Sequence, residues 1–423
     1  MTATDQTQVR RRRVFYIPGY DPIHPRRYRE LYRKEAGRQA KISGYQIDLT
    51  AKKADGGPYG WHVDALIEGA PVAADVDVLF WSDIVRSSMS NSIPATYLHL
   101  VRTAWTYIST GTLRRLMRLR KGPVIAALYP VGMLLLQLLL ALLAAWGVAY
   151  GIGLLGAMLP VFGPVSGTVV STVVQALALG VALVSAVAVL RWFRARDGKL
   201  FAYYLMHDYA YSARLKGANP PELEQRMAEF GDLITDALRS DVDEVLVVGH
   251  SSGAHVGVSV LADLIRAGQV RKGGPALGFL TLGQVVPMVS FLPKAHRLRA
   301  DLRYLSARDE LFWVDVSAPG DGCAFALCDP VTVSGVAPAS KKWPLVFSAA
   351  FSQTLSPERW AALRWRFFRL HFQYLCAFDR PGDYDYFRIT AGPQTLAARY
   401  VGRPASRSRI DVAVSKYTSV RAA

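Results

Sequence analysis

An uncharged stretch of 69 residues, 122–190, constrains this chain of 423 residues more than any other feature of the sequence. It contains no Lys, Arg, Asp, Glu or His. A helix that crosses a bilayer needs about 20 apolar residues, so the stretch is long enough for two spans. Two prolines and two glycines interrupt it at 159–167, where we place the break. The spans are then predicted at about 128–157 and 168–190.

A pair of buried core helices in a soluble protein is the alternative interpretation of this stretch. Soluble helices of such length usually carry a charged face, so a transmembrane helical hairpin is favoured. Basic residues stand on both sides of it, namely Arg114, Arg115, Arg118, Arg120 and Lys121 before it and Arg191, Arg194, Arg196 and Lys199 after it. The positive-inside rule places both flanks in the cytoplasm. We therefore expect an integral protein of a bacterial inner membrane, with both termini cytoplasmic.

The formal net charge of +17 raises the question of nucleic-acid binding. The basic residues gather beside the predicted spans, at 10–13 and at 359–369. Attraction to the anionic lipids of the cytoplasmic leaflet explains these positions better than a groove for a phosphate backbone. Membrane lipids are thus the expected partner, and nucleic acid is not. The three cysteines have no metal-ligand spacing, and we expect neither a disulfide, nor a metal site, nor a cofactor.

Outside the uncharged stretch, short β-rich runs alternate with longer helical patterns. This alternation predicts an α/β fold, a mostly parallel sheet flanked by helices and interrupted by the hairpin. Strands are predicted at 14–17, 76–81, 245–248, 277–282 and 311–316, and helices at 219–239 and 254–267. The hairpin separates the second strand from the third. Both flanks of the hairpin must therefore return to the same sheet.

The predicted organisation has four parts. Residues 1–112 form the first part of a cytoplasmic α/β domain, and 200–400 form the second part, which carries the chemistry. Residues 113–199 are the hairpin with its basic flanks. The polar composition of 401–423 predicts a disordered tail.

The pentapeptide Gly249-His250-Ser251-Ser252-Gly253 matches the pattern G-x-S-x-G. A predicted strand precedes it and an apolar-periodic helix follows, which is the strand, sharp turn and helix that a nucleophile elbow requires. Ser251 takes the nucleophile position, and Gly249 and Gly253 let the strand and the helix approach each other. The alternative is an ordinary glycine-rich turn that binds a phosphate at the helix N-terminus.

On this motif and its context the chain resembles the α/β-hydrolase superfamily, which includes serine esterases and lipases, over nearly everything except the hairpin and the tail. The resemblance implies an oxyanion hole made of two backbone N–H groups. One comes from Ser252. The other comes from a loop after an early strand, where this chain has Pro18-Gly19-Tyr20 in place of the usual His-Gly-X. Tyr20 is then the second donor, and Gly19 permits the turn.

The resemblance also implies the chain order serine, acid, histidine. Three histidines follow Ser251. His255 is too close in sequence to return to Ser251, and His296 precedes any acid-bearing strand. His371 is therefore the predicted general base.

The predicted acid lies beyond the strand at 311–316. Asp321 falls in the loop that follows this strand, where the acids of the superfamily are found. Asp315, Asp309 and Asp329 are the rival candidates. In this interpretation the acid orients His371, which takes the proton of Ser251 during acyl-enzyme formation.

Three classes of function are compatible with these sequence features. The first is a membrane-anchored serine hydrolase that cleaves a lipid, acylglycerol or thioester-like substrate. The second is a catalytically inactive membrane scaffold that keeps the same fold, and the third is a nucleic-acid binder. A transport path is disfavoured because the predicted spans contain no ionisable residue.

Overall fold

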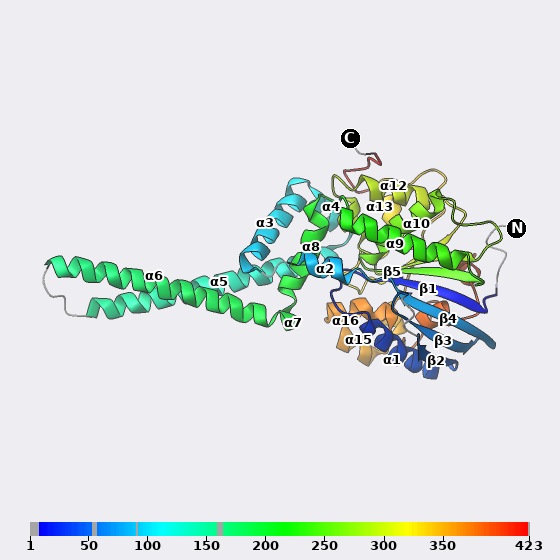
Figure 1. The fold of residues 1–423 in the computed structure, drawn as a ribbon, viewed down its shortest axis with the longest axis horizontal. Coiled ribbons are helices and arrows are strands. Elements are labelled where there is room, and N and C mark those ends of the chain that lie inside the picture. The colour runs from blue at the N-terminus through cyan, green and yellow to red at the C-terminus, as the bar shows by residue number, and fades with distance from the viewer. Residues whose placement is uncertain (1–7, 53–56, 90–91, 159–163, 422–423) are drawn as a thin grey trace. The chain divides into compact units, whose positions relative to one another are not determined.

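The chain forms two units, one built around a β-sheet and one built of helices (Figure 1). The computed structural model describes residues 8–52, 57–89, 92–158 and 164–421. The α/β unit comprises Met1–Ser88, Trp105–Ala126 and Ser212–Ala423, and the helical unit comprises Met89–Ala104 and Ala127–Tyr211. The 113–126 segment, expected to belong to the hairpin, is thus part of the α/β unit.

A mixed sheet of eight strands, in the order β2-β3-β4-β1-β5-β6-β7-β8, forms the α/β unit. The strands are β1 (Arg11–Ile17), β2 (Gln46–Ala51), β3 (Gly60–Ile67), β4 (Ala70–Val78), β5 (Glu244–His250), β6 (Ala276–Leu282), β7 (Phe312–Ser317) and β8 (Leu345–Ser348). From β4 to β8 all neighbours are parallel, while β2 and β3 add an antiparallel edge. The predicted α/β class with a mostly parallel sheet is confirmed.

The five predicted strands correspond to β1, β4, β5, β6 and β7. The prediction missed β2, β3 and β8. Strands β2 and β3 are partly exposed and mix charged with apolar residues. Their sequences therefore lack the continuous apolar run by which a buried parallel strand is predicted. Strand β8 has only four residues, too few for a pattern to emerge.

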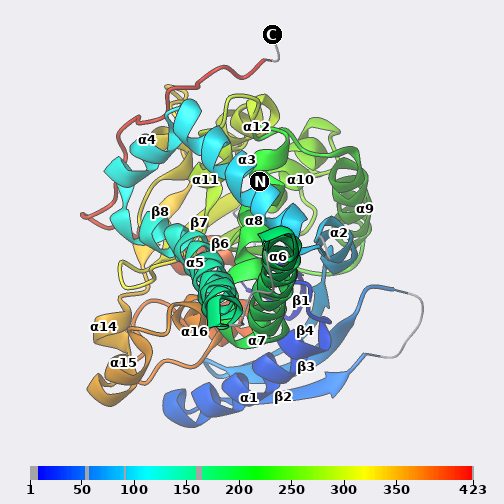
Figure 2. The same cartoon turned by 90° about the vertical axis from the view of Figure 1, so that its left-hand side faces the viewer.

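Helices cover both faces of the sheet (Figures 1 and 2). Helices α9 (Pro221–Leu238), α10 (Gly253–Arg266) and α12 (His296–Leu305) lie on one face, and α1 (Arg26–Ser43) and α16 (Phe367–His371) lie on the other. Helix α17 (Tyr386–Ala391) packs beside α1, where Tyr386 and Phe387 contact Tyr32. The remaining helices of this unit are α2 (Ser82–Ser88), α4 (Thr112–Leu119), α11 (Val286–Ser290), α13 (Pro330–Val333), α14 (Phe351–Thr354), α15 (Pro357–Leu363), η1 (Phe372–Leu375) and α18 (Leu396–Tyr400). Helix α3 (Ile93–Ser109) belongs to both units.

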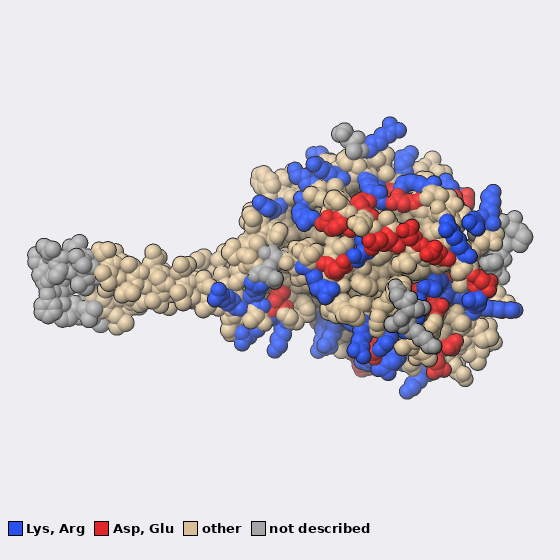
Figure 3. All heavy atoms as spheres, in the orientation of Figure 1, with Lys and Arg blue, Asp and Glu red and all other residues tan. Residues whose placement is uncertain are grey.

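Two long helices, α5 (Lys121–Met158) and α6 (Pro164–Ala195), dominate the helical unit, which also contains α7 (Asp197–Leu200) and most of α8 (Ala202–Arg214). Their apolar side chains are largely exposed, for example Leu143 and Leu183, and most of their surface is uncharged (Figure 3). Both are long and apolar enough to cross a membrane. The predicted break at 159–167 falls partly outside the described residues, which omit 159–163.

The basic cluster at 10–13, expected to attract a membrane leaflet, is partly built into the sheet. Arg12 is fully buried and donates to Glu244 at 2.6 Å, while Arg11 pairs with Asp241 and Arg13 with Asp77. The reason is the register of the central strand, because Arg12 stands directly opposite Glu244 on β5. Arg12 and Arg13 neutralise acids of the sheet, and the buried Arg12 cannot meet a leaflet. For the exposed Arg10 and Arg11, attraction to a leaflet stays a prediction.

The C-terminal tail also differs from the expectation of disorder. Residues 401–421 contain no helix or strand, yet their backbone is bound to the α/β unit. The Asp329 N–H donates to the Ile410 carbonyl at 2.9 Å, and the Ile410 N–H donates to Leu327 at 2.7 Å. Further along, Arg299 donates to the carbonyl of Ser419 at 2.7 Å. Backbone pairing holds the tail despite its polar composition.

The buried Arg12–Glu244 pair generates a prediction about stability. Glu244→Gln leaves the Arg12 guanidinium buried without its counter-charge, which costs about 3 kcal/mol or more of folding free energy. We expect a clear fall in the thermal midpoint of the detergent-solubilised chain. Asp241→Asn removes the exposed partner of Arg11 and serves as the control, with little effect. Equal midpoints for the two variants would contradict the assignment.

Candidate active site

Ser251 lies in a strained turn between β5 and α10. Its φ is +56°, a left-handed conformation that non-glycine residues rarely adopt. Such a backbone costs about 1–3 kcal/mol and persists only where its surroundings enforce it. Here the Ser251 N–H donates to the Leu282 carbonyl at 2.9 Å, and its own carbonyl accepts from Ala254 at 3.2 Å. The turn is therefore held from both β6 and α10.

The two motif glycines are needed because backbone segments crowd around this turn. A Cβ on Gly253 would lie 2.1 Å from the carbonyl oxygen of Ile17, and one on Gly249 would lie 2.8 Å from the Cα of Ala254. Neither position has room for a side chain. The glycines let α10 pack against the end of β1, as the motif predicts.

The segment around Gly19 lies directly against Ser251. A Cβ on Gly19 would be 3.0 Å from the Ser251 Cβ and 3.4 Å from its Oγ. The N–H of Tyr20, the predicted second oxyanion donor, donates to the Ser252 hydroxyl at 2.8 Å. The structure thus places Tyr20 beside the nucleophile position, but with its N–H already engaged.

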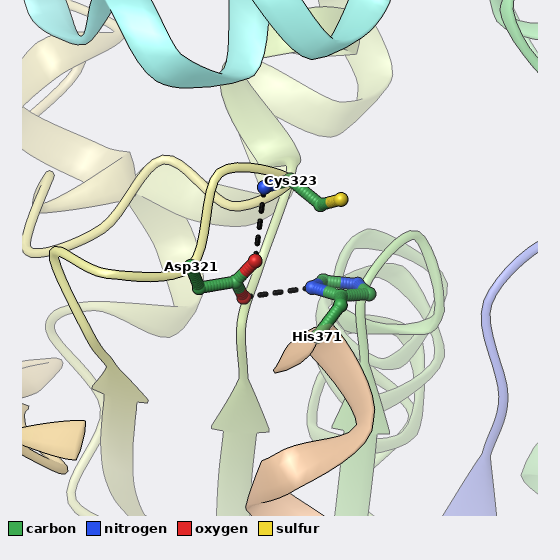
Figure 4. Close-up of side chains that lie close together, drawn as sticks. All are labelled: Asp321, Cys323 and His371. Atoms are coloured by element: carbon green, nitrogen blue, oxygen red, sulfur yellow. Dashed lines mark hydrogen bonds and ion pairs between the residues drawn. The ribbon is translucent and has the colours of Figure 1, made fainter. Parts of the chain in front are cut away.

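His371 and Asp321 form a buried pair (Figure 4). The His371 Nδ1 lies 2.7 Å from the Asp321 Oδ2, and only 6% and 2% of the two residues are exposed. Two more donors converge on the Asp321 carboxyl, the N–H of Cys323 at 2.9 Å and the hydroxyl of Tyr374 at 3.0 Å. Three hydrogen bonds therefore fix the orientation of the acid.

The other ring nitrogen of His371 has no hydrogen-bond partner among the described residues, although it is buried. A buried nitrogen without a partner costs free energy, and a role in a reaction is one reason for keeping it. Because the Nδ1 donates to Asp321, the Nε2 of the neutral ring is the basic atom. His371 thus offers an oriented, unused proton acceptor.

Short backbone links bring Ser251 close to this pair. The carbonyl that receives the Ser251 N–H belongs to Leu282, and a Cβ on the next residue, Gly283, would lie 3.1 Å from the His371 Cε1 and 3.2 Å from the Asp321 Oδ2. The left-handed Gly283 leaves space for both side chains. The turn of Ser251 and the His371–Asp321 pair thus lie near the C-terminal ends of β5, β6 and β7, although no hydrogen bond joins the Ser251 hydroxyl to the His371 Nε2 in the described part of the chain.

His250 connects the turn to the histidine. Burial, reinforced by the neighbouring His371, lowers the pKa of His250 well below its ordinary value and keeps its ring neutral. Its Nε2 lies 3.0 Å from the carbonyl oxygen of His371, so this nitrogen donates. The Nδ1 then accepts from the Tyr16 hydroxyl at 3.2 Å. His250 therefore holds the backbone that carries His371.

The rival acids lie elsewhere. Asp315 accepts from Thr281 at 2.6 Å within the sheet. Asp309 pairs with Lys342, and Asp329 caps α13 and pairs with Lys341. Among the four candidates, Asp321 alone is bonded to His371 in the described part of the chain.

The two rejected histidines also lie apart from this pair. His255 is buried within α10, and His296 begins α12 and contacts Ser419 and Arg299.

Tyr374 and Cys323 were not predicted from the sequence. Tyr374 follows His371 by three residues, a helical spacing that could have flagged it. Burial, together with the negative Asp321, raises the pKa of Tyr374 well above its usual value, so its hydroxyl stays a donor. Asp321, Cys323 and His371 each present a ligand atom within 4.8 Å of the others. A thiophilic metal ion bound there would compete with the Asp321–His371 hydrogen bond.

No protein-family model, no curated protein and no solved structure matches the chain.

The buried Asp315 generates a prediction about pH. Burial raises the pKa of its carboxyl to about 8, against about 4 in an unfolded chain. Between these pH values the folded state holds a proton that the unfolded state releases, so stability falls as the pH rises. Asp315→Asn removes this loss. We expect the variant to gain thermal midpoint over the wild type at pH 8 but not at pH 5, and an equal difference at both would contradict the assignment.

Proposed function

We propose that the chain is a membrane-anchored serine hydrolase of the α/β-hydrolase type that cleaves an ester of a lipid, acylglycerol or thioester-like substrate. One observation carries the proposal. A buried histidine, bonded to Asp321 and with its other nitrogen unused, lies in the same cluster of strand ends as a serine in a strained turn. The combination of backbone strain at a serine with a buried, unused histidine nitrogen is typical of a nucleophile and its base.

In the proposed reaction, Ser251 Oγ attacks the carbonyl carbon of the ester while His371 Nε2 takes the hydroxyl proton. The tetrahedral intermediate collapses, the bond to the leaving group breaks, and His371 returns the proton to the departing alcohol or thiol. Water then attacks the acyl-enzyme, with His371 again as base, and releases the acid. Throughout, Asp321 stabilises the imidazolium and keeps the ring oriented.

The membrane part of the proposal rests on α5 and α6. Both apolar helices are flanked by basic residues on the same side of the hairpin, which supports a cytoplasmic catalytic unit and cytoplasmic termini. The first helix begins at Lys121, within the α/β unit. The hairpin then acts as an anchor.

A catalytically inactive scaffold is the second candidate, and one contact favours it. The Tyr20 N–H, needed for the oxyanion, is occupied by the Ser252 hydroxyl. Losing one oxyanion donor lowers kcat by about 100-fold to 1,000-fold in serine proteases. Full activity therefore requires that this hydrogen bond break when substrate binds.

Labelling by a fluorophosphonate probe tests the proposed nucleophile. The detergent-solubilised wild type should be labelled, Ser251→Ala should not, and His371→Ala should react at least about 1,000-fold more slowly because the base is lost. His296→Asn, which changes a histidine outside the site, should label normally. A folded but unlabelled wild type would favour the inactive scaffold, whereas labelling of Ser251→Ala would mean that another residue is the nucleophile and would overturn the assignment of Ser251.

Removing the Ser252 hydroxyl tests the second oxyanion donor. Ser252→Ala keeps the backbone N–H of residue 252 and releases the N–H of Tyr20. We expect kcat/KM on a short-chain ester to rise, or to stay within about threefold of the wild type, because backbone donors carry the stabilisation. A fall of more than about tenfold would mean that the hydroxyl itself takes part in catalysis.

A further inference from the structure

A small surface beside the histidine combines exposed aromatic rings with unpaired positive charge. It consists of Arg364, Trp365, Arg366, Phe367 and Arg369, here called the 364–369 patch. The Trp365 side chain is 72% exposed and Phe367 is 41% exposed. The three arginines are exposed as well, and none of them forms an ion pair within the described residues. By contrast, the nearby Arg359 pairs with Asp379 at 3.2 Å and is not part of the patch.

The patch packs against the loop that carries the acid. Phe367 opens α16, the helix that ends at His371. Its ring covers Gly322, where a Cβ would lie 2.9 Å from the Phe367 Cδ1. Trp360 covers Gly320 in the same way, at 2.5 Å. Asp321 therefore sits between two glycines that are each covered by an aromatic ring.

The same loop touches the start of α5. A Cβ on Gly122 would lie 3.7 Å from the Gly322 Cα, and Arg120 donates to the Ala326 carbonyl at 2.9 Å. Gly122, Gly322 and Phe367 all belong to the α/β unit, so these contacts lie within one body. The loop of the acid is thus in contact both with the patch and with the first turn of the apolar helix.

We propose that the 364–369 patch docks on the surface of an anionic bilayer and that Ser251 takes its ester from that bilayer. The inference rests on the membrane anchoring proposed above. A helix that loses its last charge at Lys121 must enter the apolar layer within a few turns, which brings the adjoining loop to the interface. Tryptophan and arginine are the residues that favour this depth and an anionic leaflet.

Activity on two esters in nanodiscs of the full chain separates docking from catalysis. The patch variant Arg364→Gln/Trp365→Ala/Arg366→Gln should hydrolyse a fluorogenic diacylglycerol ester in anionic nanodiscs about tenfold more slowly, since each arginine adds attraction to the leaflet. Its hydrolysis of a water-soluble short-chain ester should be unchanged. The control variant Arg271→Gln/Lys272→Gln/Val401→Ala removes two exposed charges and one exposed apolar side chain elsewhere and should match the wild type on both substrates.

Each other outcome overturns the docking proposal or identifies what failed. Equal losses on both esters would make the patch a structural support of the acid loop, and no loss on either would leave it without a role.

If the wild type cleaves neither ester, the proposed function fails, and docking is then judged by fluorescence alone. Subtracting the tryptophan fluorescence of Trp365→Phe from that of the wild type leaves the emission of Trp365, and we expect brominated lipids to quench this emission. A signal that stays unquenched overturns docking, and cross-linking between copies at this patch would assign it to a second chain.

Discussion

The crowding of backbone around the 249–253 turn is the constraint on which the rest of the site depends. Helix α10 approaches the end of β1 so closely that Gly253 has a carbonyl oxygen where a side chain would be. This approach forces Ser251 into its left-handed conformation and turns its N–H toward β6. The segment after β6 then positions Gly283 against His371 and Asp321. A local packing requirement in two residues therefore propagates to the arrangement of the whole cluster.

In the described part of the chain, the polar side chains of Asp321, Tyr374 and His250 around the histidine all have hydrogen-bond partners. The Asp321 carboxyl receives three hydrogen bonds. The Tyr374 hydroxyl accepts from the N–H of Ala318 and donates to Asp321, so it links two points of the loop after β7. The ring of His250 donates to the backbone carbonyl of His371. The Nε2 of His371 is left without a partner in the described part of the chain. Preorganised surroundings with one unused acceptor are what a general base requires, because little reorganisation accompanies proton transfer.

The parts of the fold and site that sequence predicted are those with strong local signals. An uncharged stretch of 69 residues and a G-x-S-x-G motif between a strand and a helix are visible without contacts. Asp321 and His371, chosen by resemblance and chain order, were found bonded, yet nothing local in the sequence distinguishes Asp321 from Asp315. The burial of Arg12 and its ion pair with Glu244 could not be predicted, because Glu244 lies 232 positions away in the sequence and the two residues meet only through the register of β1 and β5. The prediction of a disordered tail was wrong for the same reason, because the backbone of the tail pairs with residues that are distant in the sequence.

The position of the hairpin in the chain has a consequence for synthesis. Strand β1 pairs on one edge with β4, which leaves the ribosome early, and on the other with β5, which follows only after both apolar helices. During the interval, the half-sheet β2-β3-β4-β1 exposes an unpaired edge on β1, which carries Val14, Phe15 and Ile17 after its three arginines. Such an edge is prone to wrong pairing until its partner arrives. Synthesis of both apolar helices therefore precedes closure of the sheet, so the strand that carries the Ser251 turn joins β1 only after the helices have been made.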